Sequence, residues 1–400
     1  MTNDSHNERF HESFRVAIDN SAKTPSHIAC VGMGWFPKTP GGLDRYVYEL
    51  THYLAAGGDR VTLYGLDLPK AEPNSSLELI NLATPDSPLW ERLWLTRKNF
   101  SRFQAVKPDA INLHFALYSL PLLQNLPDIP VTFTFHGPWA LESEKEGESK
   151  LAVFLKQWLV EKTVYRRCDR FIVLSKAFGD ILHQQYQVPR SKINIIPGGV
   201  DLKRFQPNLS RQQARLQLNW SGDRFIIFSP RRLVNRMGLD KLLTAIAQIK
   251  SRIPEIWVAI AGIGPLGAAL EQQATDLGLK EHVKFLGFLP DCQLPIAYQA
   301  ADLSIMPSQS LEGFGLTLVE SLACGTPALC TPVGGMPEIL TPFSPDLITS
   351  SCEVAAIAER LEELITGQIP LPSRAACQQY AATHFDWQKI ALQVRQILLT

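Results

Sequence analysis

The sequence predicts an α/β protein of two tandem domains, each built on an open parallel β-sheet. Short apolar runs rich in β-branched and aromatic residues alternate with longer stretches in which apolar residues recur at helical spacing. Such alternation indicates parallel strands joined by helical crossovers. The chain has 400 residues, more than one ordinary hydrophobic core accommodates, so two domains are expected.

The composition excludes several other classes of protein. The 39 Lys and Arg residues balance 39 Asp and Glu residues, so bulk binding to nucleic acid is not expected. No run of about 18 apolar residues occurs, and the N-terminal segment lacks an apolar signal core, which predicts a cytoplasmic protein. Seven cysteines, an odd number without a CxxC pair, fit reduced thiols better than disulfides or zinc.

Residues 27–205 are predicted to form the first domain, after a flexible segment of residues 1–26. Helices are predicted over residues 43–56, 151–167 and 177–186, where apolar residues recur at helical spacing. The strands of this domain are predicted to begin at His27, Arg60, Leu77, Ala110, Val131, Arg170 and Lys192.

A polar segment that contains Pro207 marks the domain boundary, and residues 206–384 are predicted to form the second domain. Residues 385–400 are predicted to be a helix that packs on one domain or crosses back to the first. Two sheets in tandem leave a cleft between the carboxyl ends of their strands, where ligands of such sheets usually bind. The strands of the second domain are predicted to begin at Phe225, Trp257, Val283, Leu303, Pro327 and Asp346.

The most informative segment lies in the second domain, at residues 303–339. A buried strand is predicted to end at Met306, and a helix to begin near Leu316, directly after Gly313, Phe314 and Gly315. Glycines before a helix N-terminus leave backbone N–H groups and the positive end of the helix dipole facing outward, which suits a diphosphate. A diphosphate-binding loop is therefore predicted here.

Two glutamates flank this loop in the string EGFGLTLVE. Glu320 could accept two hydrogen bonds from ribose hydroxyls, and Glu312 could hold the hydroxyls of a sugar. The segment resembles the retaining glycosyltransferases of family 4, which have the GT-B fold of two Rossmann-like domains and include enzymes of bacterial polysaccharide and glycolipid biosynthesis. The resemblance implies that Glu312 is catalytic and contacts the donor sugar, and that Glu320 binds the ribose. It also implies that the stretch from Gly313 through Leu316 to Thr317 binds the donor sugar and diphosphate, whereas the alternative is a solvated helix face.

A second segment, SPRRLVNRMGLDKL, leads from a buried strand into two arginines. Arginines at the carboxyl end of a strand face the cleft, and a guanidinium suits a diphosphate that gains negative charge. By resemblance, Arg232 matches a catalytic arginine of the family, but Met237 stands where the family has a lysine. Either Arg236 supplies the second cation by a different approach, or diphosphate binding rests more on Arg232 and the helix terminus. A pair of surface arginines is the alternative to both.

The turn GIGPLG, at residues 262–267, satisfies the literal G-x-G-x-x-G fingerprint of nicotinamide oxidoreductases. Pro265 inside the turn, and the lack of an acidic residue after the next strand, count against that interpretation. The resemblance instead places Gly264 near the donor, and Phe288 and Leu289 against the nucleobase.

The first domain contributes a second glycine pair and a histidine to the expected cleft. Gly41 and Gly42 precede a predicted helix, and the resemblance implies that they face the donor phosphates, whereas an ordinary tight turn is the alternative. His136 ends a predicted strand, and the resemblance implies that it contacts the donor sugar or assists acid/base chemistry. For His114, at the end of another strand, a structural role is equally well supported.

The segment of residues 90–107 predicts a basic amphipathic helix of the type that lies at a membrane interface. It begins at Trp90, ends at Lys107 and mixes further aromatic residues, Trp94, Phe100 and Phe103, with arginines and lysines. A helix that simply covers the first sheet is the alternative. If the helix is interfacial, the enzyme would bind the inner membrane face and glycosylate a lipid-linked sugar.

These observations and the resemblance together predict a retaining hexosyltransferase that uses a nucleotide-diphosphate sugar and a glycan or lipid-linked glycan acceptor. UDP-glucose is the first expectation for the donor, ahead of GDP-mannose and UDP-N-acetylglucosamine. No D-x-D sequence and no cluster with metal-ligand spacing occurs, so neither a metal ion nor another cofactor is predicted. Two alternatives stay open: a catalytically silent protein that binds sugar nucleotides or glycans, suggested by Met237, and a nicotinamide oxidoreductase.

Overall fold

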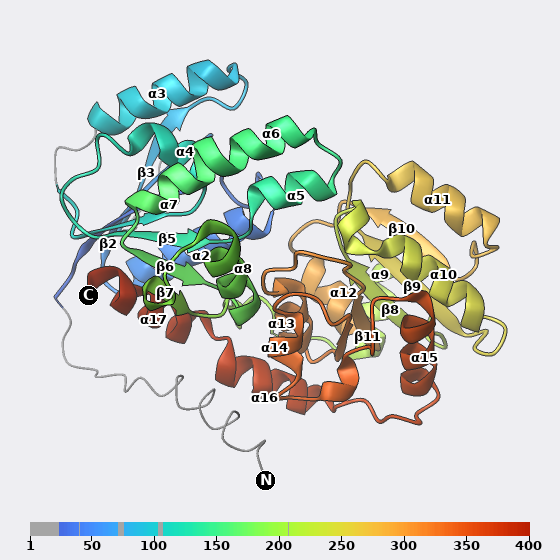
Figure 1. The fold of residues 1–400 in the computed structure, drawn as a ribbon. Helices are drawn as coiled ribbons and strands as arrows, with labels where there is room; N and C mark the ends of the chain where they lie inside the picture. Colours follow the sequence, from blue (N-terminus) through green and yellow to red (C-terminus); the bar gives the residue numbers. More distant parts are fainter. Residues whose placement is uncertain (1–23, 40, 71–75, 103–106, 207) are drawn as a thin grey trace, which may run out of the picture.

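The computed structural model describes residues 24–39, 41–70, 76–102, 107–206 and 208–400. These residues form two α/β domains that lie side by side, with helices on the faces of both sheets (Figure 1). The first 23 residues, most of the predicted N-terminal segment, and Phe103 lie outside the described residues.

The first domain has a seven-stranded, wholly parallel sheet with the order β3-β2-β1-β4-β5-β6-β7. All seven strands predicted for this domain are confirmed. Their bounds are β1 His27–Val31, β2 Arg60–Leu66, β3 Leu77–Ala83, β4 Ala110–Leu113, β5 Val131–Phe135, β6 Arg170–Val173 and β7 Ile193–Ile195.

The second domain has a five-stranded parallel sheet with the order β10-β9-β8-β11-β12. Its strands are β8 Phe225–Pro230, β9 Ile256–Ala261, β10 Val283–Gly287, β11 Leu303–Met306 and β12 Ala328–Cys330. The sixth strand predicted for this domain, at Asp346, is wrong. Pro345 begins a 3-10 helix, because its ring fixes φ and it has no N–H for a sheet, and only Ile348 forms a bridge to Cys330.

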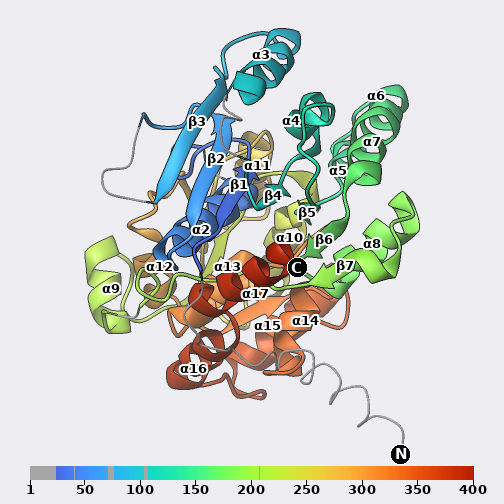
Figure 2. The same cartoon turned by 90° about the vertical axis from the view of Figure 1, so that its left-hand side faces the viewer.

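The helices of the first domain cover both faces of its sheet (Figures 1 and 2). They are α2 Gly42–Ala56, α3 Leu89–Arg102, α4 Ala116–Ser119, α5 Trp139–Lys145, α6 Lys150–Leu155, α7 Lys162–Arg167 and α8 Lys176–Tyr186, with a short 3-10 helix, η1 Leu120–Leu122. The single helix predicted over residues 151–167 is interrupted by a π-helix, η2 Lys156–Glu161. Within this wider turn Glu161 is fully buried, and its carboxylate accepts a hydrogen bond from the hydroxyl of Tyr186 at 2.8 Å.

The second domain contains α9 Arg211–Leu218, α10 Leu239–Ile249, α11 Gly267–Asp276, α12 Leu294–Ala300, α13 Leu316–Ala323, α14 Met336–Leu340, α15 Val354–Ile365 and α16 Arg374–His384. The last helix, α17 Trp387–Leu399, packs against α2 and β4 of the first domain (Figure 2). Arg395 on α17 forms a bidentate ion pair with the buried Asp59, at 2.7 and 2.8 Å. The chain therefore crosses between the domains twice, near Val200 and near Phe385, where the N–H of Val200 donates to the carbonyl of Phe385 at 2.7 Å.

All seven cysteines are free thiols, and five of them are buried. Burial raises the pKa of the Cys30 thiol to about 12, so this side chain behaves as a small apolar residue.

Candidate functional site

The glycine-led loop and the start of α13 lie where the two domains meet. Gly315, the N-cap of α13, has a φ of 102°, a conformation that favours glycine. The side chain of Leu316 lies between two glycines of the first domain: an added Cβ on Gly198 would stand 2.9 Å from it, and one on Gly42 would stand 3.9 Å away. The predicted Gly42, with the exposed Gly41 next to it, therefore faces the start of α13 across the domain boundary.

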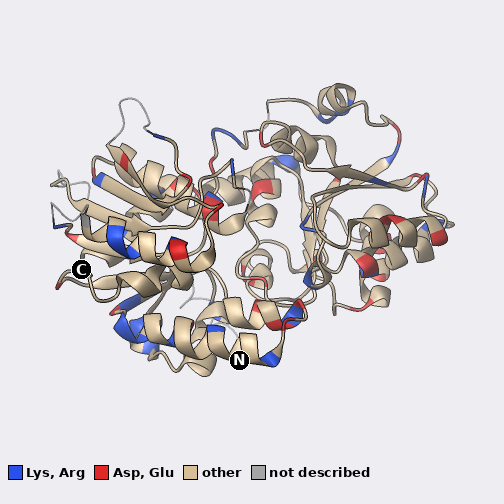
Figure 3. Cartoon of the chain, turned by 90° about the horizontal axis from the view of Figure 1, so that it is seen from above, with Lys and Arg blue, Asp and Glu red and all other residues tan. Residues whose placement is uncertain are grey.

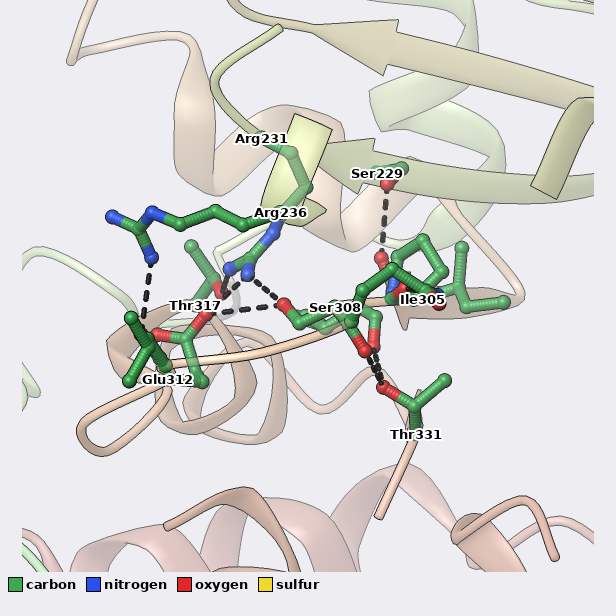
Figure 4. Close-up of polar contacts among 12 residues, drawn as sticks. Ser229, Arg231, Arg236, Ile305, Ser308, Glu312, Thr317 and Thr331 are labelled. Atoms are coloured by element: carbon green, nitrogen blue, oxygen red, sulfur yellow. Dashed lines mark hydrogen bonds and ion pairs between the residues drawn. The ribbon is translucent and has the colours of Figure 1, made fainter. Parts of the chain in front are cut away.

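Glu312 is held by Arg231, the first residue after β8 (Figure 4). The guanidinium of Arg231 donates to the carboxylate of Glu312 and to the hydroxyl of Ser308, and it lies 3.4 Å from Oγ1 of Thr317. The side chains of Arg231 and Glu312 are only 5% and 16% exposed. Burial alone would raise the pKa of Glu312, but Arg231, aided by Arg236 and Ser308, lowers it below its ordinary value, so Glu312 is a carboxylate at neutral pH.

The backbone around Glu312 is fixed from two sides. Leu311 has a φ of 52°, which is unfavourable for a residue with a side chain, and Arg236 donates to its carbonyl at 3.1 Å (Figure 4). On the other side, the N–H of Gly335 donates to the carbonyl of Glu312 at 3.0 Å. An added Cβ on Gly334 would stand 1.8 Å from that same carbonyl oxygen, so only glycine allows this approach.

The two arginines after β8 have different environments. Arg231 is buried against Glu312, whereas the side chain of Arg232 is exposed and has no ion pair among the described residues. Partial burial, and then the positive charge of Arg236, lowers the pKa of Arg232, while Glu142 of α5 acts in the opposite direction. Arg232 is therefore a cation at the domain boundary that no carboxylate neutralises by direct contact.

Arg236 bridges the domains. Besides holding the carbonyl of Leu311, it lies 3.6 Å from the carboxylate of Glu142 and 3.8 Å from that of Glu146. Met237, the next residue, is buried, and its thioether carries no charge.

Glu320 is paired across the domain boundary. It is 4% exposed, and its carboxylate accepts hydrogen bonds from Arg45 of α2 at 2.5 Å and from the hydroxyl of Tyr298 at 3.0 Å. Burial raises the pKa of Glu320, against the effects of Arg45 and Tyr298. The sequence had predicted a carboxylate open to ribose hydroxyls, but the structure shows Arg45 in contact with it.

Arg45 is itself fixed by several partners. It also binds Asp291, in the loop after β10, at 2.7 Å, and its guanidinium lies 4.8 Å from the ring centroid of Phe36 and 5.3 Å from that of Phe205. A small cavity beside this cluster is lined by residues of both domains, among them Glu49 and Leu316.

His136 lies directly after β5 and against the glycine loop. Its Nε2 is 3.0 Å from Nδ1 of His114, and an added Cβ on Gly313 would stand 3.2 Å from the His136 carbonyl. Burial lowers the pKa of His136 to about 3 and that of His114 well below its ordinary value. Both imidazoles are therefore neutral at neutral pH, with one nitrogen as donor and the other as acceptor.

The domain boundary beside this loop is closed by further polar contacts. The hydroxyl of Ser175 donates to the carbonyl of Gly313 at 2.6 Å. The carboxylate of Glu338 accepts hydrogen bonds at 2.8 Å from the backbone N–H groups of Lys176 and Ala177, at the start of α8.

The glycine turn after β9 packs on the loop that carries Arg231. An added Cβ on Gly262 would stand 1.9 Å from the carbonyl oxygen of Arg231, and one on Gly264 would stand 2.4 Å from that of Leu233. Close backbone packing therefore accounts for the G-x-G spacing without a nicotinamide dinucleotide. Phe288, 55% exposed, and the half-buried Leu289 follow the edge strand β10, which two strands separate from β11.

Sequence reasoning missed the partners of both glutamates. Arg231 stood in a segment already singled out, but which of two adjacent arginines turns inward cannot be decided from their spacing. Arg45 is 275 residues from Glu320 in the chain, and only the relative placement of the domains brings them together.

Within the described part of the chain, no group of three His, Cys, Asp or Glu side chains is arranged to hold a metal ion. Among the same residues, no helix has both the length and the apolar character needed to cross a membrane.

Comparison with known proteins identifies the family. The model of "Glycosyltransferase Family 4" matches residues 40–204, and that of "Glycosyl transferases group 1" matches residues 210–384, so the two account for both domains. The chain belongs to glycosyltransferase family 4. This glycosyltransferase is 32% identical over 209 residues to a "GDP-mannose-dependent alpha-(1-6)-phosphatidylinositol monomannoside mannosyltransferase" of Mycolicibacterium smegmatis, a match that covers 50% of the chain and 54% of that relative. It is 28% identical over 306 residues to a D-inositol 3-phosphate glycosyltransferase of Corynebacterium jeikeium, covering 73% of the chain and 72% of the relative.

Solved structures share the fold of this glycosyltransferase. Sucrose-phosphate synthase from Thermosynechococcus elongatus superposes with a TM-score of 0.78 at 24% identity, covering 93% of this chain and 98% of that one. Anabaena HepE, solved in complex with UDP and glucose, gives a TM-score of 0.72 at 21% identity, covering 93% and 99%. At these identities the likeness establishes the two-domain GT-B fold.

Proposed function

We propose that this glycosyltransferase is a retaining, metal-independent enzyme that moves a hexose from a nucleotide-diphosphate sugar to a glycan or lipid-linked glycan. The observation that carries the proposal is the arrangement at the start of α13. A buried carboxylate, Glu312, precedes a helix N-terminus that begins with glycine, and Arg231 binds this carboxylate and lies 3.4 Å from Oγ1 of Thr317 in the first turn. The next residue, Arg232, is an exposed cation. The N–H groups of the first turn have no partner within a helix, so they suit an anion.

In this proposal the donor diphosphate lies over Gly313, Phe314, Gly315, Leu316 and Thr317. Negative charge develops on its leaving oxygen as the bond from the sugar C1 breaks, and Arg232, Arg236 and the helix dipole stabilise that charge. The hydroxyl oxygen of the acceptor forms the new bond to C1 from the same face, and its proton passes to the departing phosphate oxygen. Charge stabilisation by these arginines and the helix stands in for a metal ion.

Glu312 and His136 are proposed to hold the hydroxyls of the donor sugar. The carboxylate accepts hydrogen bonds, and Arg231 keeps it ionised and in place. Because burial lowers the pKa of His136 to about 3, this side chain acts as a neutral hydrogen-bonding group and not as an acid at neutral pH. Gly41, Gly42 and Gly264 allow backbone to approach the donor, and Phe288 and Leu289 are proposed to contact the nucleobase.

Glu320 is proposed to bind the ribose by exchange of partners. Arg45 contacts this carboxylate in the structure, so two ribose hydroxyls would replace its guanidinium, and the contacts of Arg45 across the domain boundary would break. Donor binding is thereby coupled to the spacing of the two domains.

Two donors have support. UDP-glucose is the donor expected from the sequence, and GDP-mannose stands in the printed name of the Mycolicibacterium smegmatis relative. That name also includes a phosphatidylinositol monomannoside, which supports a lipid-borne acceptor here.

The test is a thermal-shift panel of UDP, GDP, their hexose conjugates and NAD, followed by a donor hydrolysis assay. A ligand that binds only the native state raises the melting temperature, so the panel identifies the nucleotide. Glu320→Gln should weaken nucleotide binding, and Glu312→Gln should reduce transfer far more than nucleotide affinity. The exposed Glu359, on α15, provides a matched control in Glu359→Gln, which should change neither.

Other outcomes of this test would favour the alternatives. Binding of a nucleotide sugar without any hydrolysis or transfer would support a silent binding protein. A shift with NAD that survives Glu320→Gln would support an oxidoreductase, and equal effects of both glutamate variants on binding and transfer would contradict the assigned roles.

A further inference from the structure

Exposed apolar side chains gather on one face of the first domain. Eight of the twelve large hydrophobic side chains that are exposed in the described part of the chain belong to two helical segments of this domain. They are Leu89, Trp90 and Trp94 on α3, and Leu151, Phe154, Leu155, Trp158 and Leu159 on α6 and η2.

The two segments flank the same short helical turn. α3 packs on η1, and α4, which leads directly into η1, packs on η2. Figures 1 and 2 both show α3, α4 and α6 along the upper side of the first domain. We call the outward side chains of α3, α6, η2 and α7 the aromatic–basic surface.

Packing of the protein core does not account for these side chains. Each segment has an inward face of its own: Phe100 on α3 is 2% exposed, and Val153 on α6 and Val164 on α7 are 9% and 0% exposed. Trp90 and Trp94, at 73% and 56%, lie outside that inward face. A patch of this kind on a folded protein marks a contact with another apolar body.

The charge of the aromatic–basic surface indicates what kind of partner it would bind. Between residues 89 and 101 and between residues 150 and 167 there are eight Lys and Arg residues, of which Lys162 is buried and Lys156 forms an ion pair with Glu148. The same stretches contain two acidic residues, Glu91 and the buried Glu161, so the charge that reaches solvent is mainly positive. The whole chain has no net charge, so this is a local concentration, and Figure 3 shows blue segments, with red ones among them, along the helices of this side.

The basic groups are interleaved with the aromatic rings. Nζ of Lys98 lies 4.8 Å from the ring centroid of Trp94, and Nζ of Lys162 lies 3.8 Å from that of Trp158. The rings of Phe154 and Trp158 are 5.9 Å apart. Aromatic rings next to cations suit the boundary between acyl chains and anionic head groups.

We propose that the aromatic–basic surface docks the enzyme on an anionic lipid bilayer. The residues predicted from the sequence to be interfacial, on α3, form only one half of it, and α6, η2 and α7 supply the other half. A second copy of the chain would present the same positive surface to itself in a two-fold dimer, which like charges oppose.

The surface leads to the proposed acceptor side of the site. α5 begins three residues after His136, and Nζ of Lys156, in η2, lies 4.4 Å from the ring centroid of Trp139, its first residue. A lipid-linked acceptor held in the bilayer would therefore reach the domain boundary along α5. This last step rests on the proposed function, whereas the docking itself does not.

The test is co-sedimentation of the full chain with vesicles. Vesicles of equal parts phosphatidylglycerol and phosphatidylcholine should bind the protein, vesicles of phosphatidylcholine alone should bind it much more weakly, and added salt should weaken binding. The double variant Trp90→Ala/Trp158→Ala should lower the partition coefficient by about tenfold or more. Arg97→Gln and Lys98→Gln should each lower it by about fivefold on anionic vesicles.

The matched control is Leu216→Ala, which removes a side chain that is 77% exposed on α9 of the second domain. It should bind vesicles like the parent protein. Equal loss in control and test variants, or no binding of the parent protein to anionic vesicles, would refute the proposal. A dimer in solution that Trp90→Ala/Trp158→Ala abolishes would refute it in favour of a second copy.

Two further measurements separate this proposal from the proposed function. The melting temperature of each variant shows whether it is folded, and nucleotide binding should be unchanged in all of them. Loss of vesicle binding with intact nucleotide binding therefore tests the surface alone, and the reverse result tests the donor site alone.

Discussion

Arg231 and Arg232 are adjacent in the chain, and the structure predicts opposite results when each is replaced by methionine. Arg231→Met would leave the buried carboxylate of Glu312 without its cation. Removing one partner of a buried ion pair destabilises a protein by about 3–5 kcal/mol. Arg232 is exposed and has no ion pair among the described residues, so Arg232→Met should change stability by no more than about 0.5 kcal/mol.

Nucleotide binding, unlike stability, should depend on Arg232. Arg232→Met leaves the fold intact but removes a cation from the proposed diphosphate site. Hydrogen bonds to charged groups contribute about 1.5–3 kcal/mol, so nucleotide affinity should fall roughly 10-fold to 150-fold. Urea unfolding measures the first effect, and calorimetric titration with the nucleotide found in the thermal-shift panel measures the second.

A double variant and a pH series make the test of Arg231 sharper. Arg231→Met/Glu312→Gln should regain much of the stability that Arg231→Met loses, because no charge is then left unpaired. Arg231 holds the pKa of Glu312 below the ordinary value of 4.5, so the pair contributes stability above pH 4.5 that is lost as the pH falls through the lower value of the folded protein. Equal stability of both single variants, or no recovery in the double variant, would refute this account of the two arginines.

Two further predictions concern a buried acid and a backbone contact. Burial raises the pKa of Glu161 to about 7, so its contribution to stability is present below pH 4.5 and lost as the pH rises through 7. Glu161→Gln should remove that dependence and gain about 3 kcal/mol relative to the parent protein at alkaline pH, measured by urea unfolding across a pH series, and a parallel pH dependence of both proteins would contradict it. Gly262 has a φ of 147°, and its added Cβ would meet the Arg231 carbonyl at 1.9 Å, so Gly262→Ala should lower the free energy of unfolding by more than about 2 kcal/mol. The control Gly222→Ala, where nothing lies within 4 Å, should be nearly neutral, and equal effects of the two would mean that the turn after β9 is not closely packed.

Much of the fold could be predicted because local sequence determines it. Buried parallel strands are continuous apolar runs, which can be recognised in the sequence. The strands that end at Pro230 and Met306 were both predicted, together with the site loops that follow them. The helix after EGFG begins at Leu316, as predicted from its glycines. A strand was wrongly predicted at Asp346 because the apolar residues of this segment lie beside β12 but form only one β-bridge with it.

The site could be predicted less fully because its contacts are not local. The arginines after β8 were expected to bind the diphosphate, but Arg231 binds Glu312 instead, since the direction of a side chain that leaves a strand depends on where the strand ends. The pairing of Glu320 with Arg45 depends on how the domains are placed, which no spacing within one segment reports. The π turn at Glu161 was missed because one added residue barely changes the helical spacing of the apolar residues.

The position of α17 determines when the first domain can complete its fold during synthesis on the ribosome. Trp387, the first residue of that helix, is 2% exposed and stacks edge-on against Tyr46 of α2 with ring centroids 5.0 Å apart. The domain that is synthesised first therefore lacks part of its covering until α17, a helix of 13 residues, has left the ribosome. A nascent chain halted after the second domain should keep Tyr46 accessible to solvent and to chaperones, and removal of α17 should harm the half of the molecule that was made earliest.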